Sequence, residues 1–492
     1  MPQIVEHAAL IRQAFNLRLL LSVSLIAFSQ AMDAFAHKFG SYNKTAKAWQ
    51  VEPEFLSLLN SLPYVGFVIG LFIGSTISAR WGRRMTMFSM SIYAMATVPI
   101  TVTSKTKAQI LTARTLNYAY LGMELAVVPV FQAEIVPASV RGLVVATYQL
   151  AIYIGGLIMS IVCQATSNLA GDQQWQIPLG LFAVIPAIVA GLVWFIPESP
   201  RWLLMHGRAE ESFAALKKLR EGSFTEEETA AEFDALQLLL SEEHEKGKYK
   251  EIFQGPNLKR TLISIGINVF LQITGQVFAA RYGTVYIKSL GTVNAFTMTI
   301  VNQVVCLLGV LFSMALTDKL GRRPLLMFSG AVQAVSLYGM AGLDTPAVVT
   351  RQMKIGVVAF FCVFNFGFCS GWAPLSHTLS AEIPTARLRD MTYRTASTVN
   401  IVLTLVMSRI IPYLLNAPYA NLGSKVGYIF GSTSILAIIF TYYCVPECKG
   451  KTLEELDRLF LDGVPLRQFQ QTTVVPELDE KEQTVGVHVE RV

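Results

Sequence analysis

Long apolar runs recur along this chain and leave it few ways to fold. There are twelve of them, each close to the length of about 20 residues that a helix needs to cross a bilayer. Backbone polar groups within lipid must be satisfied inside the segment, so each run is expected to be helical. We therefore predict an all-α membrane protein with twelve transmembrane helices. The predicted spans are 17–36, 56–78, 85–103, 108–131, 143–165, 177–196, 262–286, 293–317, 324–341, 354–380, 392–414 and 426–445.

The composition agrees with a membrane protein and excludes several other classes. Only 15% of the residues are charged and 52% are apolar, whereas soluble domains carry about 25% charged residues. The net charge of +6 does not indicate a nucleic-acid partner, because the basic residues gather at the ends of apolar runs. The six cysteines are scattered and fit no disulfide framework or metal site. We find no catalytic or phosphate-binding motif, so we expect no enzyme, no cofactor and no metal.

A short basic turn occurs twice and indicates that the chain is an internal duplication. The turns are residues 79–84 and 318–323, and 239 positions separate Gly82 from Gly321. Two further motif pairs follow in the same order, which predicts two pseudo-symmetric six-helix halves with a substrate site between them. These pairs are Glu134 and Arg141 with Glu382 and Arg389, each arginine seven positions after its glutamate, and the segments 197–201 with 446–450.

The polar segments divide the chain into regions. Between the halves lies the only long polar insert, where apolar residues at helical spacing predict two short amphipathic helices at 210–220 and 226–245. We interpret the insert as a helical linker packed under the bundle, and the tail after 461 as largely disordered. The predicted regions are a cytoplasmic N-terminus 1–16, a first bundle 17–196, a linker 197–261, a second bundle 262–445 and a cytoplasmic tail 446–492.

The distribution of Lys and Arg predicts the orientation. Loops that follow even-numbered spans are the more basic, although the first loop on the other side also carries His37 and Lys38. By the positive-inside rule both termini are expected in the cytoplasm. Asn43 then lies outside and is a candidate for glycosylation, because Asn43-Lys44-Thr45 has the acceptor pattern.

The basic turns and the repeated glutamates suggest a conformational latch on the cytoplasmic side. A carboxylate at one helix end and an arginine on a neighbour can form a charge-assisted, bidentate bond, and we expect such bonds to join the two halves. The alternative is simple positive-inside anchoring, which needs neither the glutamates nor the fixed spacing. The latch candidates are Arg80, Arg83, Arg84, Glu134, Arg141, Glu198, Arg201, Asp318, Arg322, Arg323, Glu382, Arg389 and Glu447.

These motifs make the chain resemble the sugar porter family of the major facilitator superfamily, particularly its fungal members. The resemblance extends from about residue 17 to 459. It implies the major facilitator fold and a secondary transporter that moves a small solute by alternating access. A plasma-membrane location, a monomer and proton symport are further expectations. The matching segments are 80–84, 114–142, 149–151, 197–201, 318–323, 382–389 and 446–447.

The substrate pocket is where this chain departs from the family. Of three amide side chains expected on span seven only Gln272 remains, and a second glutamine expected on span five falls at Gly156. The tyrosine pair after Gln272 becomes Arg281-Tyr282. We expect the Arg281 side chain to extend to the membrane–water interface rather than contact an anionic group. The pocket is therefore less polar than a hexose normally needs. Substrate-binding candidates by resemblance are Gln149, Gln272, Asn302, Trp372, His377 and Asn400.

Three residues are candidates for proton coupling. The resemblance matches Arg114 to the family's arginine on span four, but the family's aspartate on span one is absent. Asp33, the only carboxylate of span one, is either a partner of Arg114 or a solvated residue at the edge of the loop. Glu124 lies in the middle of span four, where burial favours the protonated form. It is either a proton carrier or a protonated side chain bonded to a neighbouring helix.

We interpret the chain as a transporter of a sugar or sugar-like solute. The less polar pocket leaves open a second class, a transporter or exporter of a non-sugar metabolite on the same fold. A third, a non-transporting sugar sensor, is disfavoured because the tail is of ordinary length.

Overall fold

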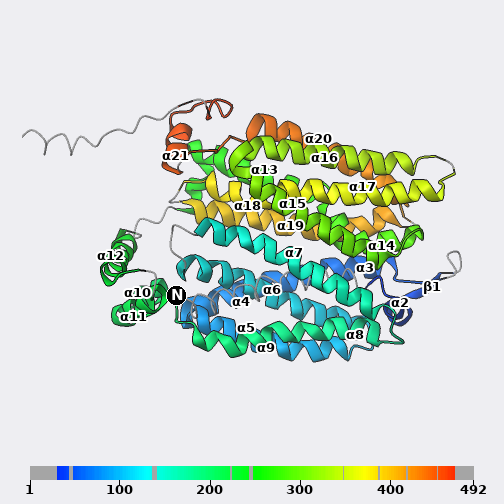
Figure 1. Cartoon of the computed structure of the whole chain (residues 1–492), viewed down its shortest axis with the longest axis horizontal. Coiled ribbons are helices and arrows are strands. Elements are labelled where there is room, and N and C mark those ends of the chain that lie inside the picture. The colour runs from blue at the N-terminus through cyan, green and yellow to red at the C-terminus, as the bar shows by residue number, and fades with distance from the viewer. Residues whose placement is uncertain are drawn as a thin grey trace, which may run out of the picture.

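The computed structural model shows a bundle of long helices that run side by side in two stacked halves (Figure 1). The first half lies below the second in this view, and the α10–α12 insert lies at one end of the bundle. The described residues are 30–43, 48–135, 141–221, 224–242, 248–346, 348–385, 388–416, 419–451, 453–470 and 472.

The first half contains helices that fill predicted spans two to six and a short hairpin at one end of the bundle. Its two strands pair antiparallel, with Ser41 opposite Gln50. The elements are α2 (Asp33–Phe39), β1 (Ser41–Asn43), β2 (Ala48–Gln50), α3 (Pro53–Ser61), α4 (Pro63–Trp81), α5 (Arg83–Val102), α6 (Lys107–Ile135), α7 (Arg141–Thr166), α8 (Gln173–Gly180), η2 (Leu181–Ala183), α9 (Val184–Leu192) and η3 (Val193–Phe195).

The insert between the halves contains two longer helices, as its periodicity predicts, with short helical turns on either side. Arg220 fixes it to the first half by donating to the carbonyl oxygen of Ile135 at 2.9 Å. The hydroxyl of Tyr249 in the insert and that of Thr395 in the second half share a hydrogen bond of 2.7 Å. The insert therefore contacts both halves. Its elements are α10 (Pro200–Met205), α11 (Ala209–Arg220), α12 (Glu226–Glu242) and η4 (Tyr249–Phe253).

The second half repeats the arrangement of the first. Its last helix packs at the end of the bundle where the insert lies (Figure 1). Arg260 on its first helix pairs with Asp457 on its last. The elements are α13 (Gly255–Ile273), α14 (Gln276–Leu290), α15 (Ala295–Leu320), α16 (Arg322–Leu343), α17 (Arg351–Ser370), α18 (Trp372–Glu382), α19 (Arg389–Leu415), η6 (Gly423–Lys425), α20 (Val426–Cys444) and α21 (Leu453–Leu461).

The described helices account for eleven of the twelve predicted spans. Within the described residues, nine helical stretches are long and apolar enough to cross a membrane, and α6 and α7 supply the fourth and fifth spans. Most of the first predicted span, 17–36, lies outside the described residues. The fold class is confirmed as an all-α, twelve-span membrane protein of two six-helix halves.

The two glycine turns have the same backbone conformation. Gly82 has φ 92° and ψ 167°, and Gly321 has φ 96° and ψ 169°. Positive φ at this position favours glycine, because a Cβ atom would be strained there. A transmembrane helix begins directly after each turn. The duplication seen in the sequence is therefore present in the backbone, and we call the end of the bundle with these turns the basic end.

Two spans of the second half are broken near their middle, which hydropathy alone does not reveal. Gly275, in the left-handed region with φ +100°, separates α13 from α14. Gly371 separates α17 from α18, and a Cβ atom there would lie 2.5 Å from the Cβ of Ser329. A side chain cannot fit so close a contact, so the neighbouring helix α16 requires glycine at that break.

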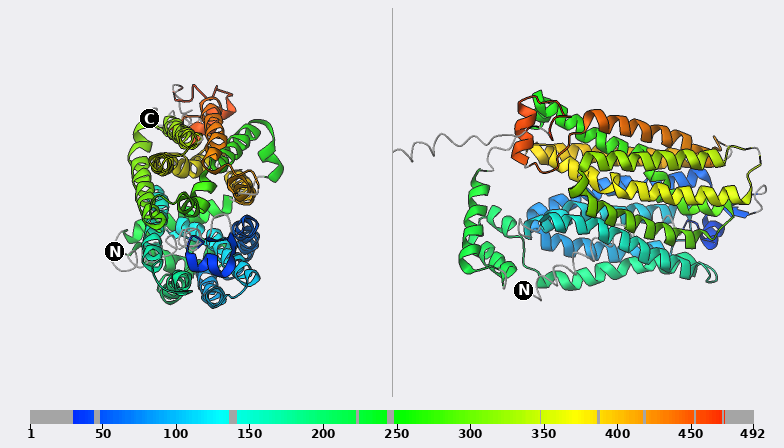
Figure 2. Two further views of the ribbon diagram at one scale, coloured as in Figure 1. Left: turned by 90° about the vertical axis from the view of Figure 1, so that its right-hand side faces the viewer. Right: turned by 45° about the horizontal axis from the view of Figure 1, so that its top comes forward.

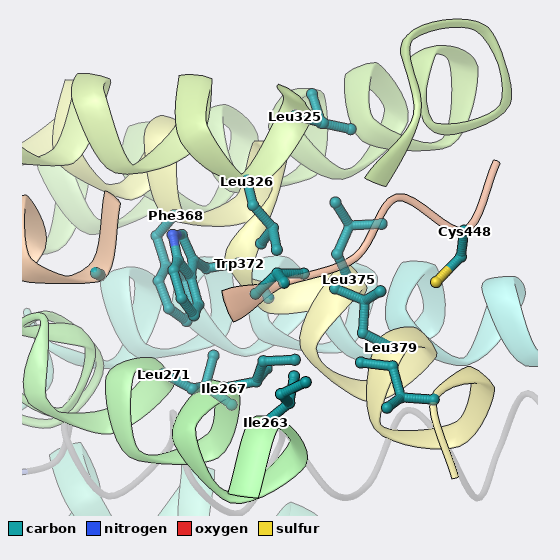
Figure 3. Packing of buried hydrophobic residues seen from close by; sticks show 14 of the residues in the cluster. Ile263, Ile267, Leu271, Leu325, Leu326, Phe368, Trp372, Leu375, Leu379 and Cys448 are labelled. Carbon is teal, nitrogen blue, oxygen red and sulfur yellow. The ribbon is translucent and has the colours of Figure 1, made fainter. Parts of the chain in front are cut away.

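Each half has its own hydrophobic core. In the second half the ring of Trp372 packs against Phe368 and Leu326, with Ile267 and Leu271 of α13 on the other side (Figure 3). The 45° view separates the halves clearly and shows the insert projecting beyond the basic end (Figure 2). Two other clusters reach between the halves, because Phe296 packs among residues of the first half and Leu56 among residues of the second.

Candidate functional site

A chain of amide side chains connects two spans of the second half. Gln272 on α13 donates through Nε2 to Oδ1 of Asn400 on α19 at 3.0 Å. Asn400 donates through Nδ2 to Oδ1 of Asn268 at 3.0 Å. Asn268 in turn donates to Oγ of Ser380 on α18 at 2.9 Å. Buried polar groups that bond to one another in this way hold their helices and each other in fixed positions.

The network leaves one amide oxygen without a hydrogen-bond partner among the described residues. Gln272 is buried, and its Oε1 has no hydrogen-bond partner among the described residues. A buried unpaired acceptor is costly, so a solute hydroxyl that reached it would be bound favourably. Sequence reasoning identified Gln272 and Asn400 but missed Asn268. Asn268 lies four positions before Gln272, hence on the same helix face, and this spacing could have revealed it.

The other substrate-binding candidates have different environments. His377 is exposed within its span, and its Nδ1 lies 3.4 Å from the hydroxyl of Tyr393. Asn302 is half-buried, and its Oδ1 has no partner among the described residues. Gln149 belongs to α7, but its side chain lies outside the described part of the structure. These three residues keep their predicted roles as proposals.

Trp372 does not fit the role that the resemblance implies. Its side chain is 0% exposed and packs in the hydrophobic cluster of the second half (Figure 3). A ring that stacks on a solute needs one open face, and neighbouring apolar side chains cover this one. The structure thus places the Trp372 ring in the core in this conformation, and its assignment to the pocket stays a prediction.

A glutamine from the second half occupies the space at Gly156. A Cβ atom at Gly156 on α7 would lie 3.1 Å from Oε1 of Gln303 on α15. Gln303 is buried, and this oxygen has no hydrogen-bond partner among the described residues. The glutamine that the resemblance led us to expect on span five is thus matched by one on span eight. Nearby, the thiol of Cys369 donates to the hydroxyl of Tyr153 at 3.1 Å across the same interface.

Several contacts join the halves at the end opposite the basic turns, which we call the opposite end. Arg281 on α14 donates to the hydroxyl of Tyr118 on α6 at 2.6 Å and to that of Tyr64 on α4. Ser57 on α3 donates to the carbonyl oxygen of Arg409 on α19 at 2.8 Å. The prediction that Arg281 extends to the membrane–water interface is wrong, because tyrosines of the other half hold its side chain in a buried position.

Asp33 does not pair with Arg114. Its carboxylate lies 2.7 Å from Nζ of Lys288, and its side chain is 87% exposed. Arg114 is buried in α6. The predicted alternative in which Asp33 reaches Arg114 is wrong, because Lys288 of the second half holds Asp33 at the surface. Glu124 is also buried in α6, ten positions further along the helix.

The ion pairs at the basic end each lie within one half. Arg83 and Glu134 form a bidentate pair, with Nε–Oε2 and Nη2–Oε1 distances of 3.0 and 2.9 Å. In the second half Nη2 of Arg322 lies 3.3 Å from Oε1 of Glu382. Neither pair crosses between the halves. In the described residues these two pairs therefore brace each half internally, and the expected latch between the halves stays a prediction.

The two remaining glutamates of the repeat cap helices. Glu198 accepts from the backbone N–H of Arg83 at 3.0 Å and of Arg84 at 3.1 Å, at the start of α5. Glu447 accepts from the N–H groups of Arg322 and Arg323 at 2.9 and 3.0 Å, at the start of α16. Burial raises the pKa of Glu198 above its usual value, and the backbone donors offset only part of that rise.

The other latch candidates have varied contacts. Arg84 lies 4.7 Å from the ring centroid of Trp194, and Arg323 donates to the carbonyl oxygen of Tyr442 at 2.6 Å. The side chains of Arg141 and Asp318 lie outside the described part of the structure. Arg80, Arg201 and Arg389 lie in α4, α10 and α19.

The match to known proteins is consistent with this architecture. The Sugar (and other) transporter family model matches residues 21–460. This chain belongs to the Sugar (and other) transporter family. The hexose transporter HXT8 of Saccharomyces cerevisiae is 27% identical over 447 residues, which cover 87% of this chain and 77% of that protein. The major facilitator-type transporter ecdD of Aspergillus rugulosus is 29% identical over 421 residues, covering 83% of this chain and 77% of that protein.

Solved structures share the fold of this sugar transporter family member. The inward-open conformation of the xylose transporter XylE from E. coli superimposes with a TM-score of 0.73 at 19% identity, covering 92% of this chain and 99% of the other. The family and the fold identify a membrane transporter rather than an enzyme. No group of three or more His, Cys, Asp or Glu side chains that could hold a metal ion occurs within the described residues.

Asn43 lies in β1, in the hairpin at the opposite end of the bundle. The rest of its acceptor motif, Lys44 and Thr45, falls outside the described residues, so its glycosylation stays a prediction.

Proposed function

We propose that this transporter carries a sugar or sugar-like solute across the plasma membrane as a monomer. In this proposal the basic end and both termini face the cytoplasm, and the opposite end faces outward. The orientation is supported by the arginines of the two glycine turns, Arg83 and Arg84 with Arg322 and Arg323, which the positive-inside rule assigns to the cytoplasm.

The amide network carries the proposal. Gln272, Asn400 and Asn268 present oriented amides within the second half, and the buried Oε1 of Gln272 lacks a partner among the described residues. Binding sites for polar solutes use a few fixed hydrogen-bonding groups of this kind in otherwise apolar surroundings. A second substrate class, a non-sugar metabolite that is imported or exported, is favoured by the loss of two of the three amide side chains that the resemblance implies on span seven.

Alternating access is proposed from the contacts between the halves. The hydrogen bonds of Arg281 and Ser57 join the halves at the opposite end, so this conformation is closed there. The pairs Arg83–Glu134 and Arg322–Glu382 keep each half rigid at the basic end. Rigid halves can rock about a central site because the contacts between them exchange while the cores stay packed.

Uptake in cells that lack their own hexose carriers tests the proposal. The protein should restore uptake of at least one labelled monosaccharide, disaccharide or polyol. Gln272→Ala should raise KM for that solute about fivefold, since one lost hydrogen bond is worth about 1 kcal/mol. Gln352→Ala, which changes an exposed glutamine at the start of α17, should leave KM unchanged.

The result that would reject a sugar substrate is equally clear. If the protein reaches the cell surface and no compound of a broad sugar and polyol panel enters, the substrate is a non-sugar metabolite. If Gln272→Ala and Gln352→Ala have equal effects on KM, the amide network does not contact the solute.

A further inference from the structure

Two arginines lie buried inside the bundle near the opposite end. Arg114 on α6 is 3% exposed, and Arg281 on α14 is 7% exposed. An ionised side chain within a membrane-spanning bundle is costly and is normally compensated by an opposite charge or marks a functional site. The two residues belong to different halves, so whatever compensates them lies at the interface between the halves.

Tyrosine hydroxyls, rather than carboxylates, contact these arginines in the described residues. Arg281 donates to the hydroxyls of Tyr118 and Tyr64 and lies within 6 Å of both rings, at 5.9 and 5.0 Å from their centroids. Tyr118 is one turn beyond Arg114 on α6 and interacts with both arginines. None of the three guanidinium nitrogens of Arg114 makes a well-aligned hydrogen bond within the described residues.

The carboxylates that could compensate the two arginines are engaged elsewhere or too distant. The first predicted span, 17–36, contains Asp33 as its only carboxylate. Glu124 lies ten residues beyond Arg114, which is about 15 Å along the helix. At the opposite end the described carboxylates are Asp33 paired with Lys288, Asp172 with Lys38, Glu52 with Lys107, the exposed Glu54, and Asp344, which accepts from the N–H of Ser424.

We propose that Arg114 and Arg281 bind the carboxylate of the transported solute, so that the substrate is a sugar acid or a related hydroxy acid. This inference rests on the proposed transport function and narrows its substrate class. Guanidinium groups match carboxylates in shape and form charge-assisted pairs with them. A guanidinium has five N–H groups, so the two tyrosine bonds of Arg281 leave three donors for an anion.

The rest of the site fits a solute with one charged group and few hydroxyl contacts. Gln272 lies nine residues before Arg281 on the same broken span. One end of a sugar acid would bond the amide network and the other the arginine pair. A carboxylate held by charge-assisted bonds compensates for the two amide side chains that are missing from span seven. Because the arginines come from opposite halves, the anion would draw the halves together as it binds.

A matched pair of sugars tests the inference on the purified full-length protein. D-Galacturonate differs from D-galactose by a carboxylate in place of the CH₂OH group. We expect galacturonate to bind about tenfold or more tightly than galactose, because bonds to a charged group are the stronger ones. Arg281→Gln and Arg114→Gln should each reduce this ratio to near one. Lys288→Gln, which changes a partly exposed cation at the same end, should keep the ratio.

Further readouts separate the outcomes. Equal binding of the two sugars by the wild-type protein overturns the inference even if an arginine variant fails to fold. Arg281-dependent binding of chloride or phosphate, without preference for galacturonate, shows a fixed ion and also overturns it. In proteoliposomes, galactose flux without galacturonate flux overturns this inference alone. Arg281-dependent galacturonate binding with no flux of any solute supports the site and rejects the transport function.

Discussion

Single acidic residues of this protein differ in how well they could carry a proton. Asp33 is exposed and paired with Lys288, so its carboxylate lies at the surface and outside the bundle. Glu124 is buried in α6, where an ionised carboxylate is costly and protonation is favoured. We therefore propose that proton symport runs through Glu124.

Substitution of Glu124 tests proton coupling. Glu124→Gln should abolish proton-driven accumulation of the solute, because an amide side chain cannot take up and release the coupled proton. Exchange of labelled for unlabelled solute should continue, because exchange needs no net proton movement. Asp33→Asn serves as the control and should accumulate solute normally. Accumulation by Glu124→Gln that remains sensitive to a protonophore would exclude this residue as the carrier.

Some site residues could be found from sequence and others could not. The amide at Asn268 follows from its four-residue spacing to Gln272. Gln303, by contrast, meets Gly156 only because α7 and α15 pack together, and nothing local signals that contact. Arg281 was expected at the membrane–water interface because a long cationic side chain near a helix end usually reaches water. Its two tyrosine partners lie more than 160 positions away in the chain.

At the scale of helices, the duplicated glutamate cap explains where two spans begin. The first backbone N–H groups of a helix have no partner within the helix, and Glu198 and Glu447 supply acceptors for them in α5 and α16. A carboxylate there also interacts favourably with the positive end of the helix. Span positions followed from hydropathy alone. The breaks at Gly275 and Gly371 did not, because a glycine inside an apolar run leaves its hydropathy unchanged.

Removal of either cap should destabilise the protein. Glu447→Ala leaves the N–H groups of Arg322 and Arg323 without their acceptor, at a cost of about 1–3 kcal/mol. Glu198→Ala should cost a similar amount at α5, and both variants should show a lower melting temperature in detergent. Asp234→Ala, an exposed change on α12, is the matched control. Unchanged melting of both cap variants would mean that water replaces the carboxylates without loss.

At the scale of the whole molecule, the two ends of the bundle are held in different ways. Contacts at the opposite end cross between the halves, as with Lys288 and Asp33. The described ion pairs at the basic end stay inside one half. The duplicated sequence predicted two halves, but it could not predict which contacts cross between them, because the same motif types can pair within a half or across it.

Cross-linking of the opposite end tests whether the halves separate there. In an Asp33→Cys, Lys288→Cys double variant, a short reducible cross-linker should stop transport, and reduction should restore it. Each single variant and the wild type, treated alike, should keep their rates, since five of the six native cysteines are buried and Cys444 is only partly exposed. Full transport after complete cross-linking would show that this end does not open.

The insert provides an attachment site for probes that help imaging and measure motion. Trp202 and Arg220 bond it to backbone carbonyls of the first half, while Tyr249 and Ile252 bond it to Thr395 and Thr261 of the second half. An antibody fragment bound to α11 and α12 would project beyond the detergent belt and orient single particles in electron micrographs. A fluorophore on α12 paired with one on α21 would report the angle between the lobes in real time.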